Sequence, residues 1–197
     1  SHKILIKTAP ILDITSGLNE LKFVKKIHIV AVKNEIKELL WEIEKGHLDT
    51  IEISSINIEN EKVTHFETKY REEYLSTFAS PKKYLYEPNS SIMKSENMDA
   101  LSKAFDLDKL HQHSHLFTSD KLIDFPGRRF EIDEIIPFQK EALKKIAKQK
   151  MNCSTRNFPL TVDEIKKKYK INDGGLVFAF FTTQLNNEKI VLLCTKI

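Results

Sequence analysis

The chain has 197 residues, of which 41% are hydrophobic and 30% charged, with a net charge of +3 at pH 7. These values are ordinary for a globular protein, and no apolar run approaches the roughly 20 residues that a membrane span requires. Two cysteines, Cys153 and Cys194, are too few for a disulfide framework, so a cytoplasmic location is expected.

The charge is unevenly distributed along the chain. Residues 138–170 contain ten Lys or Arg against three acids, whereas residues 34–75 contain five against eleven. The basic segment suits a polyanionic partner. The acidic middle argues against one uniform nucleic-acid-binding surface.

The first part of the chain predicts alternating strands and helices. Lys3–Thr8 and residues 27–32 are strand-like runs with a helical stretch between them. Asn34 can cap a second helix, ended by Gly46, because apolar residues repeat at helical spacing at Ile36, Leu39, Leu40 and Ile43. Trp41 lies off this stripe and is expected to cover an interdomain contact.

Residues 50–58 and 63–67 predict a hairpin. The apolar residues of 50–58 change phase near Ser54-Ser55, which predicts a bulge or bend there. Strand, helix, strand, helix and hairpin together are typical of the closing half of a doubly wound α/β domain. In such domains the ligand loop usually follows the first strand of the sheet.

The middle of the chain predicts a small βαββ unit. Residues 70–79 are expected to form a short connecting helix, and residues 80–83 a domain boundary, because Pro81 breaks helices. The elements that follow are a strand at 84–86, a helix at about 90–105 capped by Asn89, and strands at 114–118 and 129–136.

The last part begins near Pro137 and predicts two helices and three strands. In order, these are a helix at 138–149, a strand at 153–156, a lysine-rich helix opened by a capping box of Thr161 and Glu164, and a hairpin of 176–183 with 189–195.

Lysines at helical spacing form the first candidate site. Lys140, Lys144 and Lys148 recur every four residues and would make one charged stripe on a helix. Phosphate backbones attract such stripes through counterion release. The alternative is a solvated helix face without a ligand.

Two short motifs are more specific. Arg128 and Arg129 lie within Phe125-Pro126-Gly127-Arg128-Arg129-Phe130, and Arg156 with Asn157 lies within Thr155-Arg156-Asn157-Phe158-Pro159. Arginine forks bind phosphate bidentately, asparagine can read a base edge or ribose, and exposed aromatic rings can stack on unpaired bases. The alternative is that the rings are core residues and the arginines pair with local carboxylates.

Other chemistries have weaker signals. There is no glycine-rich nucleotide motif among the five glycines. His111, His113 and His115 alternate and could share one side of an extended chain, but no second ligand set accompanies them, so no metal site is predicted. Glu87 is interpreted as a buried polar anchor rather than a general base, and the cysteines as packing residues.

At these residues the chain resembles the C-terminal part of a bacterial class I S-adenosylmethionine-dependent methyltransferase with ferredoxin-like and THUMP-like domains. Four stretches carry the resemblance: residues 4–13, residues 32–41, residues 84–94, and Phe125-Pro126-Gly127-Arg128 taken with residues 155–159. They span nearly the whole chain.

The resemblance implies an α/β fold in three parts. Residues 1–70 would be the last portion of a Rossmann-like methyltransferase sheet, residues 81–133 a ferredoxin-like domain and residues 134–197 a THUMP-like α/β domain. The intact protein would use S-adenosylmethionine, held by residues that this chain does not contain, so no catalytic or cofactor-binding residue is assigned. Asp13 is expected to shape the turn after the first strand rather than to reach the cofactor.

The resemblance also implies an RNA substrate, ribosomal or transfer RNA, docked by the C-terminal domains. The predicted RNA-binding residues are Arg156, Asn157, Arg128, Arg129, Lys144 and Lys148. The open alternatives are a non-catalytic RNA-binding or interaction module and a methyltransferase with a substrate other than RNA. No membrane partner is expected, and exposed sheet edges could pair two copies as a homodimer.

Overall fold

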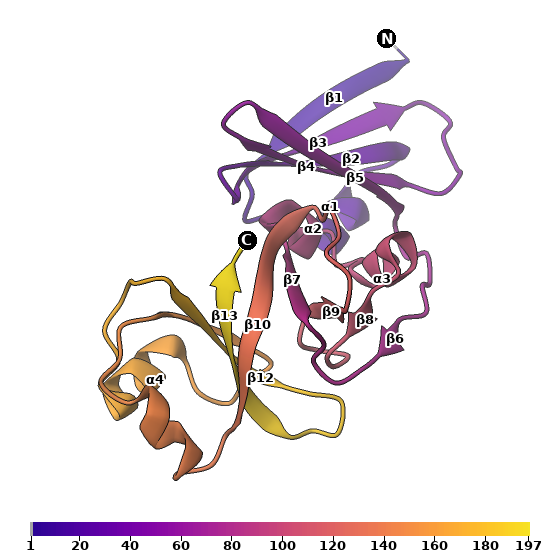
Figure 1. The fold of residues 1–197 in the computed structure, drawn as a ribbon. Helices are drawn as coiled ribbons and strands as arrows, with labels where there is room; N and C mark the ends of the chain where they lie inside the picture. Colours follow the sequence, from indigo (N-terminus) through magenta and orange to yellow (C-terminus); the bar gives the residue numbers. More distant parts are fainter. Residues whose placement is uncertain (1) are drawn as a thin grey trace. The chain divides into compact units, whose positions relative to one another are not determined.

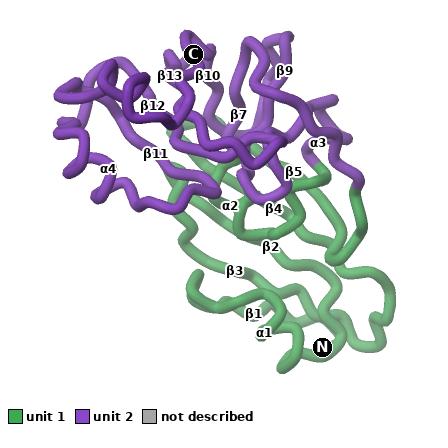
Figure 2. Tube along the Cα trace, turned by 90° about the horizontal axis from the view of Figure 1, so that it is seen from below, with its two compact units in different colours: residues 1–74, 88–100 green, residues 75–87, 101–197 purple. Residues whose placement is uncertain are grey.

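The computed structural model describes residues 2–197 (Figure 1). The chain divides into two compact units, one of residues 1–74 with 88–100 and the other of residues 75–87 with 101–197 (Figure 2). Each unit has its own β-sheet, and the few helices pack on these sheets. The α/β fold class predicted from the sequence is confirmed.

The first unit contains a five-stranded sheet of order β1-β3-β2-β4-β5. The strands are β1 (Lys3–Thr8), β2 (Val24–Val32), β3 (Glu35–Glu44), β4 (Glu52–Glu59) and β5 (Lys62–Lys69). Strand β3 is antiparallel to both β1 and β2, so these two run parallel, and β2 is also parallel to β4. The helix α1 (Ile14–Glu20) connects β1 to β2.

One face of this sheet holds the core of the first unit. Ile27 and Ile29 of β2 pair with Trp41 and Leu39 of β3, and all four side chains are fully buried. Helix α1 adds Ile14 to the same cluster. Trp41 Nε1 also donates to Thr8 Oγ1 (2.8 Å). The expectation that Trp41 covers an interdomain contact is therefore wrong, because Trp41 lies at the centre of this core.

The helix predicted after Asn34 is instead strand β3. Lys33 and Asn34 both have positive φ (52° and 61°), which is the backbone of a two-residue hairpin turn between β2 and β3. Asn34 does not cap a helix: its backbone N–H donates to Asn57 Oδ1, and its Oδ1 accepts from Ser90 N. The buried residues Leu39 and Trp41 follow a two-residue period, which the helical spacing of the flanking isoleucines and leucines concealed.

Three further local predictions are wrong. Strand β4 pairs with β2 and β5 in continuous register, so there is no bulge at Ser54-Ser55. Residues 70–79 form no helix and contain only the short strand β6 (Thr77–Phe78). The predicted helix 90–105 is interrupted after Lys94. The Ser95 hydroxyl donates back to Ile92 O, and Glu96 has a positive φ of 61°.

The interruption leaves α2 (Ser90–Lys94) and α3 (Asp99–Phe105). Asn89 caps α2 as predicted, since its Oδ1 accepts from Ile92 N (3.1 Å). Helix α2 contacts β2, β3 and β4 of the first unit. Ser55, on the core face of β4, donates to Ser91 O.

The second unit contains an eight-stranded sheet of order β11-β12-β13-β10-β7-β9-β8-β6. Its other strands are β7 (Tyr84–Pro88), β8 (Asp108–Lys109), β9 (Phe117–Ser119), β10 (Gly127–Pro137), β11 (Asn152–Arg156), β12 (Val177–Thr183) and β13 (Lys189–Lys196). The hairpin of β12 and β13 is confirmed. Helix α4 (Val162–Tyr169) begins with the predicted capping box of Thr161 and Glu164.

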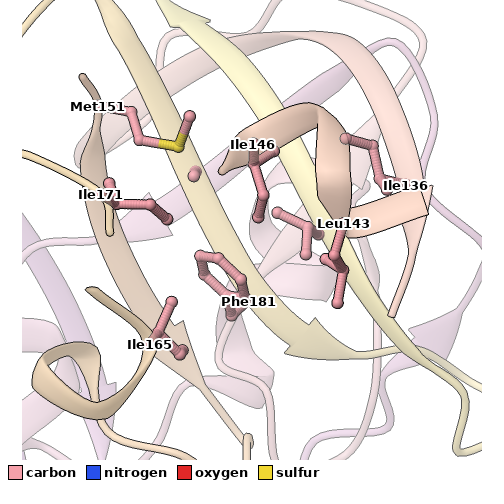
Figure 3. Close-up of a cluster of buried hydrophobic side chains, with 9 residues drawn as sticks. Ile136, Leu143, Ile146, Met151, Ile165, Ile171 and Phe181 are labelled. Atoms are coloured by element: carbon pink, nitrogen blue, oxygen red, sulfur yellow. The ribbon is translucent and has the colours of Figure 1, made fainter. Parts of the chain in front are cut away.

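Strand β12 supplies side chains to two separate hydrophobic clusters. Ala179 and Phe181 pack with α4 and with the residues that follow β10 (Figure 3). Phe180 packs in a second cluster with Leu85 of β7 and Phe130 of β10. Because both faces of β12 are covered, its sequence is a nearly continuous apolar run rather than an alternating one.

The predicted helix at 138–149 is only a short 3₁₀ turn, Ala142–Ile146. A 3₁₀ turn has three residues per turn and ends here at Ala147, so Lys140, Lys144 and Lys148 do not form one helical stripe. Lys148 has a positive φ of 62°, and its N–H donates to Tyr169 O at the end of α4. The lysine stripe is therefore wrong as a structural prediction.

Acid is expected to destabilise the fold through carboxylates whose pKa values are lowered, among them three glutamates. The pKa of Glu44 is lowered by a hydrogen bond from Lys25, that of Glu67 by one from Lys26, and that of Glu164 by the backbone N–H of Thr161. Since the folded values lie below the ordinary value of about 4.5, these groups stabilise the folded state above that pH. The contribution is lost as the pH falls through the folded values.

The measurement is the midpoint of thermal unfolding between pH 3 and pH 7, followed by circular dichroism. The midpoint should fall below about pH 4.5. Glu44→Gln removes one of the three groups, so its midpoint should fall less steeply than that of the wild type. An equally steep fall in this variant would contradict the assignment.

Candidate functional site

A buried carboxylate lies at the centre of the candidate site. The Glu87 side chain, on β7, is only 2% exposed. Its Oε2 accepts from Arg128 Nε (2.6 Å) and also contacts an Nη of Arg128, and its Oε1 lies 2.6 Å from an Nη of Arg156. The contact with Arg156 is an ion pair rather than a well-aligned hydrogen bond. Two guanidinium groups thus compensate one buried negative charge, as such burial requires.

The alternation of side chains along each strand explains why these residues meet. Glu87 lies two positions from Leu85, and Arg128 two positions from Phe130, so both share the face of the second hydrophobic cluster. Arg156, the last residue of β11, pairs with Thr182, which lies two positions from Phe180 of the same cluster. The polar cluster is therefore a continuation of the apolar one.

Some polar atoms of this cluster are not satisfied by hydrogen bonds. Within residues 2–197, Arg156 Nε and Thr182 Oγ1 are buried and have no hydrogen-bond partner. One Nη of Arg156 donates to Thr155 O (2.9 Å). The Arg128 guanidinium lies 5.5 Å from the ring centroid of Phe130, a cation–π contact. These contacts fix the positions of both guanidinium groups.

Asn157 is held beside Arg156 by a second network. The side-chain Nδ2 of Asn157 donates to His111 Nδ1 (3.0 Å), and its backbone carbonyl accepts from Thr183 Oγ1 (2.6 Å). His111 Nδ1 also accepts from His113 N, so the ring proton is on Nε2, which donates to Asn187 Oδ1. Asn157 itself is exposed and has a positive φ of 50°.

The other predicted RNA-binding residues lie at the surface of the second unit. An Nη of Arg129 is 3.8 Å from Asp124, Lys144 pairs with Glu141 in the 3₁₀ turn, and Lys148 is exposed. The structure thus brings Arg128, Arg156 and Asn157 into connected networks. It gives Arg129, Lys144 and Lys148 no contact with Glu87.

The aromatic rings of the two motifs are core residues. Phe125 contacts Tyr86, Phe130 contacts Phe180, and Phe158 packs edge-on against Phe138 (ring centroids 4.8 Å apart). Phe125 and Phe130 are 4% and 0% exposed. The expectation that these rings stack on unpaired bases is therefore wrong, and the alternative of core packing is confirmed.

Glu87 is confirmed as a buried polar anchor, but the sequence did not identify its partners. An acidic residue directly after the apolar run Tyr84-Leu85-Tyr86 was the available signal, because a buried acid needs a cation. The nearest arginine in the sequence that pairs with it is 41 residues away. Only the strand order brings them together.

Other candidate chemistries have no support in the structure. No group of three or more His, Cys, Asp or Glu side chains placed to hold a metal ion is found in residues 2–197. Burial raises the pKa of Cys153 to about 11 and raises that of Cys194 as well, so neither thiol is a reactive thiolate at neutral pH. None of the helices in the described part of the chain is long and apolar enough to cross a membrane.

Comparisons with known proteins match residues 84–196, somewhat more than half of the chain, to two families. Residues 84–126 match a ferredoxin-like domain, and residues 127–196 match a THUMP domain-like family. These segments are ferredoxin-like and THUMP-like. A search of curated proteins gives no match.

A solved structure resembles almost the whole chain. It is the crystal structure of a "putative methyltransferase" from Porphyromonas gingivalis W83, with 34% sequence identity and a TM-score of 0.90. The alignment covers 98% of this chain and 51% of that one. The chain therefore spans about half the length of the protein that it resembles.

The boundary between the two family matches passes through the candidate site. Glu87 belongs to the ferredoxin-like segment, whereas Arg128, Arg156 and Asn157 belong to the THUMP-like segment. Strands β7 and β10 are neighbours in one sheet, so the two segments share both a sheet and an ion cluster.

Proposed function

We propose that this chain is the C-terminal part of an S-adenosylmethionine-dependent methyltransferase and that its last two domains dock an RNA substrate in the cytoplasm. The observation that carries the proposal is the likeness to the methyltransferase-named structure over 98% of the chain, together with the THUMP domain-like match. Residues 1–70 would be the end of the catalytic domain, residues 81–133 the ferredoxin-like domain and residues 134–197 the THUMP-like domain.

The proposal assigns no cofactor-binding residue to this chain. Glycines let a ligand approach the backbone closely, but beside three of the glycines the chain itself fills the space, whereas a Cβ on Gly46 would meet nothing within 4 Å. A Cβ on Gly17 would meet the Trp41 ring at 2.4 Å, and Cβ atoms on Gly174 and Gly175 would meet Lys150 at 3.0 Å. Asp13 caps α1 by accepting from Ser16 N (2.8 Å), as the turn-shaping interpretation predicted. In this proposal S-adenosylmethionine is held by another part of the protein.

RNA docking would use the cations of the THUMP-like segment. The side chains of Arg128 and Arg156 are about one-third exposed, and Asn157, Lys144 and Lys148 are exposed. Arg129 is one-third exposed beside Asp124. Arginine forks position phosphates, and a fixed asparagine can contact a base or ribose. Strand β1 lies at the edge of its sheet, and its Ile4 and Leu5 side chains are exposed. In this proposal that edge pairs with the rest of the protein rather than with a second copy of the chain.

The test is RNA binding as a function of salt. If the Arg128–Arg156 pair, Arg129, Lys144 and Lys148 each neutralise one phosphate, log K should fall with log salt with a slope of about −3, from roughly 0.7 per phosphate on a single strand. The measurement is fluorescence anisotropy with labelled single-stranded RNA between 50 and 300 mM KCl. Arg156→Ala should weaken binding and make the slope less steep, by roughly one phosphate's share.

The same assay separates the alternatives. Transfer RNA, ribosomal RNA fragments and duplex DNA are compared at one salt concentration. Equal weakness toward all three would favour a methyltransferase with a substrate other than RNA. RNA binding without methyl transfer from S-adenosylmethionine by the full-length protein would favour a non-catalytic binding module.

A further inference from the structure

We propose that Glu87 is a positioning residue that makes Arg128 and Arg156 a preformed receptor for one phosphate group of RNA. The inference rests on the proposed RNA-docking function and adds to it a residue that does not itself contact RNA. An acidic residue would thus strengthen binding to a polyanion. This is the opposite of what its charge alone predicts.

The first step is the loss of freedom of the two arginines. A free arginine side chain populates many rotamers, and much of that freedom is lost when it binds a ligand. Here Arg128 is fixed by two nitrogens on Glu87 and by the ring of Phe130, and Arg156 by Glu87 and its own strand's carbonyl at Thr155. A receptor that is ordered before binding loses little entropy on binding.

The second step is where the charge is exposed. The Glu87 side chain is 2% exposed, whereas those of Arg128 and Arg156 are 32% and 31% exposed. The cluster therefore hides its single negative charge, while the two arginine side chains that reach solvent give it a net charge of +1. A phosphodiester has one negative charge and oxygens that accept from both guanidinium groups, so it matches this surface.

The third step is the neighbouring group. Asn157 follows Arg156 directly, is exposed, and is held by His111 and Thr183. A phosphate bound by the arginines would place the attached ribose or base near a fixed amide. This arrangement favours a nucleic-acid phosphate over a free inorganic anion, because only the former has a group for Asn157 to contact.

Glu87→Gln tests the inference, with Glu131→Gln as its matched control. Both substitutions raise the net charge by one. Glu131 is on β10, its side chain is 43% exposed, and it lies 3.5 Å from Lys83 rather than beside the two arginines. Charge alone predicts tighter RNA binding by both variants. The inference predicts that E131Q binds single-stranded RNA as tightly as the wild type or slightly tighter, and that E87Q binds about five- to tenfold more weakly.

The salt dependence distinguishes positioning from a loss of folded protein. E87Q should lose the phosphate contact of the arginine pair, so its slope of log K against log salt should be less steep by about 0.7 per phosphate lost. A merely unfolded fraction would lower the binding amplitude and leave the slope unchanged. Circular dichroism and urea unfolding establish the folded fraction of each variant.

A second variant covers the case in which E87Q does not fold. The double substitution Arg128→Lys with Arg156→Lys keeps the net charge and removes both guanidinium forks. It should weaken RNA binding at least fivefold. Suppose that the wild type binds RNA and that E87Q binds it as tightly as E131Q does. The inference is then overturned, and the proposed function stands. Where E87Q does not fold, the same conclusion follows if the double lysine variant binds RNA as tightly as E131Q. If the wild type does not bind RNA at any salt concentration, the proposed function fails and the inference fails with it.

Discussion

Replacing both Arg128 and Arg156 by methionine is expected to lower the free energy of unfolding by about 3–5 kcal/mol. The reason is Glu87, whose carboxylate is buried and would then have no cation beside it. Removing the partners of a buried charge is strongly destabilising, because desolvation of that charge is no longer compensated. Methionine keeps most of the side-chain length, so the loss should come mainly from the charge rather than from a cavity.

Urea unfolding followed by circular dichroism measures the effect. Arg129→Met is the matched control on the same strand, and since its contact with Asp124 is long and exposed, it should change stability by no more than about 0.5 kcal/mol. Adding Glu87→Leu to the double variant should restore most of the lost stability, because an apolar group replaces the buried charge. A triple variant no more stable than the double one would show that packing, not the lone carboxylate, causes the loss.

Gly17→Ala is expected to cost about 1–3 kcal/mol, although alanine normally favours a helix. Gly17 is buried in α1, and a Cβ there would lie 2.4 Å from Trp41 Cη2 and 2.6 Å from Cζ2. The Trp41 ring cannot move away easily, because it is fully buried and its Nε1 is hydrogen-bonded to Thr8. Overpacking a filled core has this typical cost, and it exceeds the gain in helix propensity.

Two variants isolate the cause of that loss. Asn19→Ala, at an exposed position of the same helix, should be nearly neutral, within about 0.5 kcal/mol. In a Trp41→Phe background the clashing part of the indole is absent, so Gly17→Ala should cost much less there. Equal costs of Gly17→Ala in both backgrounds, measured in a double-mutant cycle by urea unfolding, would refute the steric explanation.

The sequence predicted elements well where one local signal was unambiguous. The capping box at Thr161, the cap at Asn89 and the hairpin of β12 and β13 are as expected. Strand β3 was mistaken for a helix because its apolar residues fit both the spacing of a helix and the two-residue period of a strand. The turn at Lys33-Asn34 has left-handed residues without the glycine that usually marks such a turn.

The candidate site was predicted only in part. Arg128, Arg156 and Asn157 were identified from their chemical types, and the structure places them in networks with Glu87 and His111. Neither network could be derived from the sequence, because each joins residues dozens of positions apart through the strand order. The lysine stripe failed for a different reason: a 3₁₀ turn replaced the α-helix that its spacing assumed.

The neighbouring strands β7 and β10 limit how this protein can be dissected. A cut between residues 126 and 127 would follow the family boundary, yet it would expose two strand edges and separate Glu87 from both of its arginines. Truncated versions made at that boundary should be insoluble. A chimaera that imports the THUMP-like segment of a related protein must therefore import the ferredoxin-like segment with it.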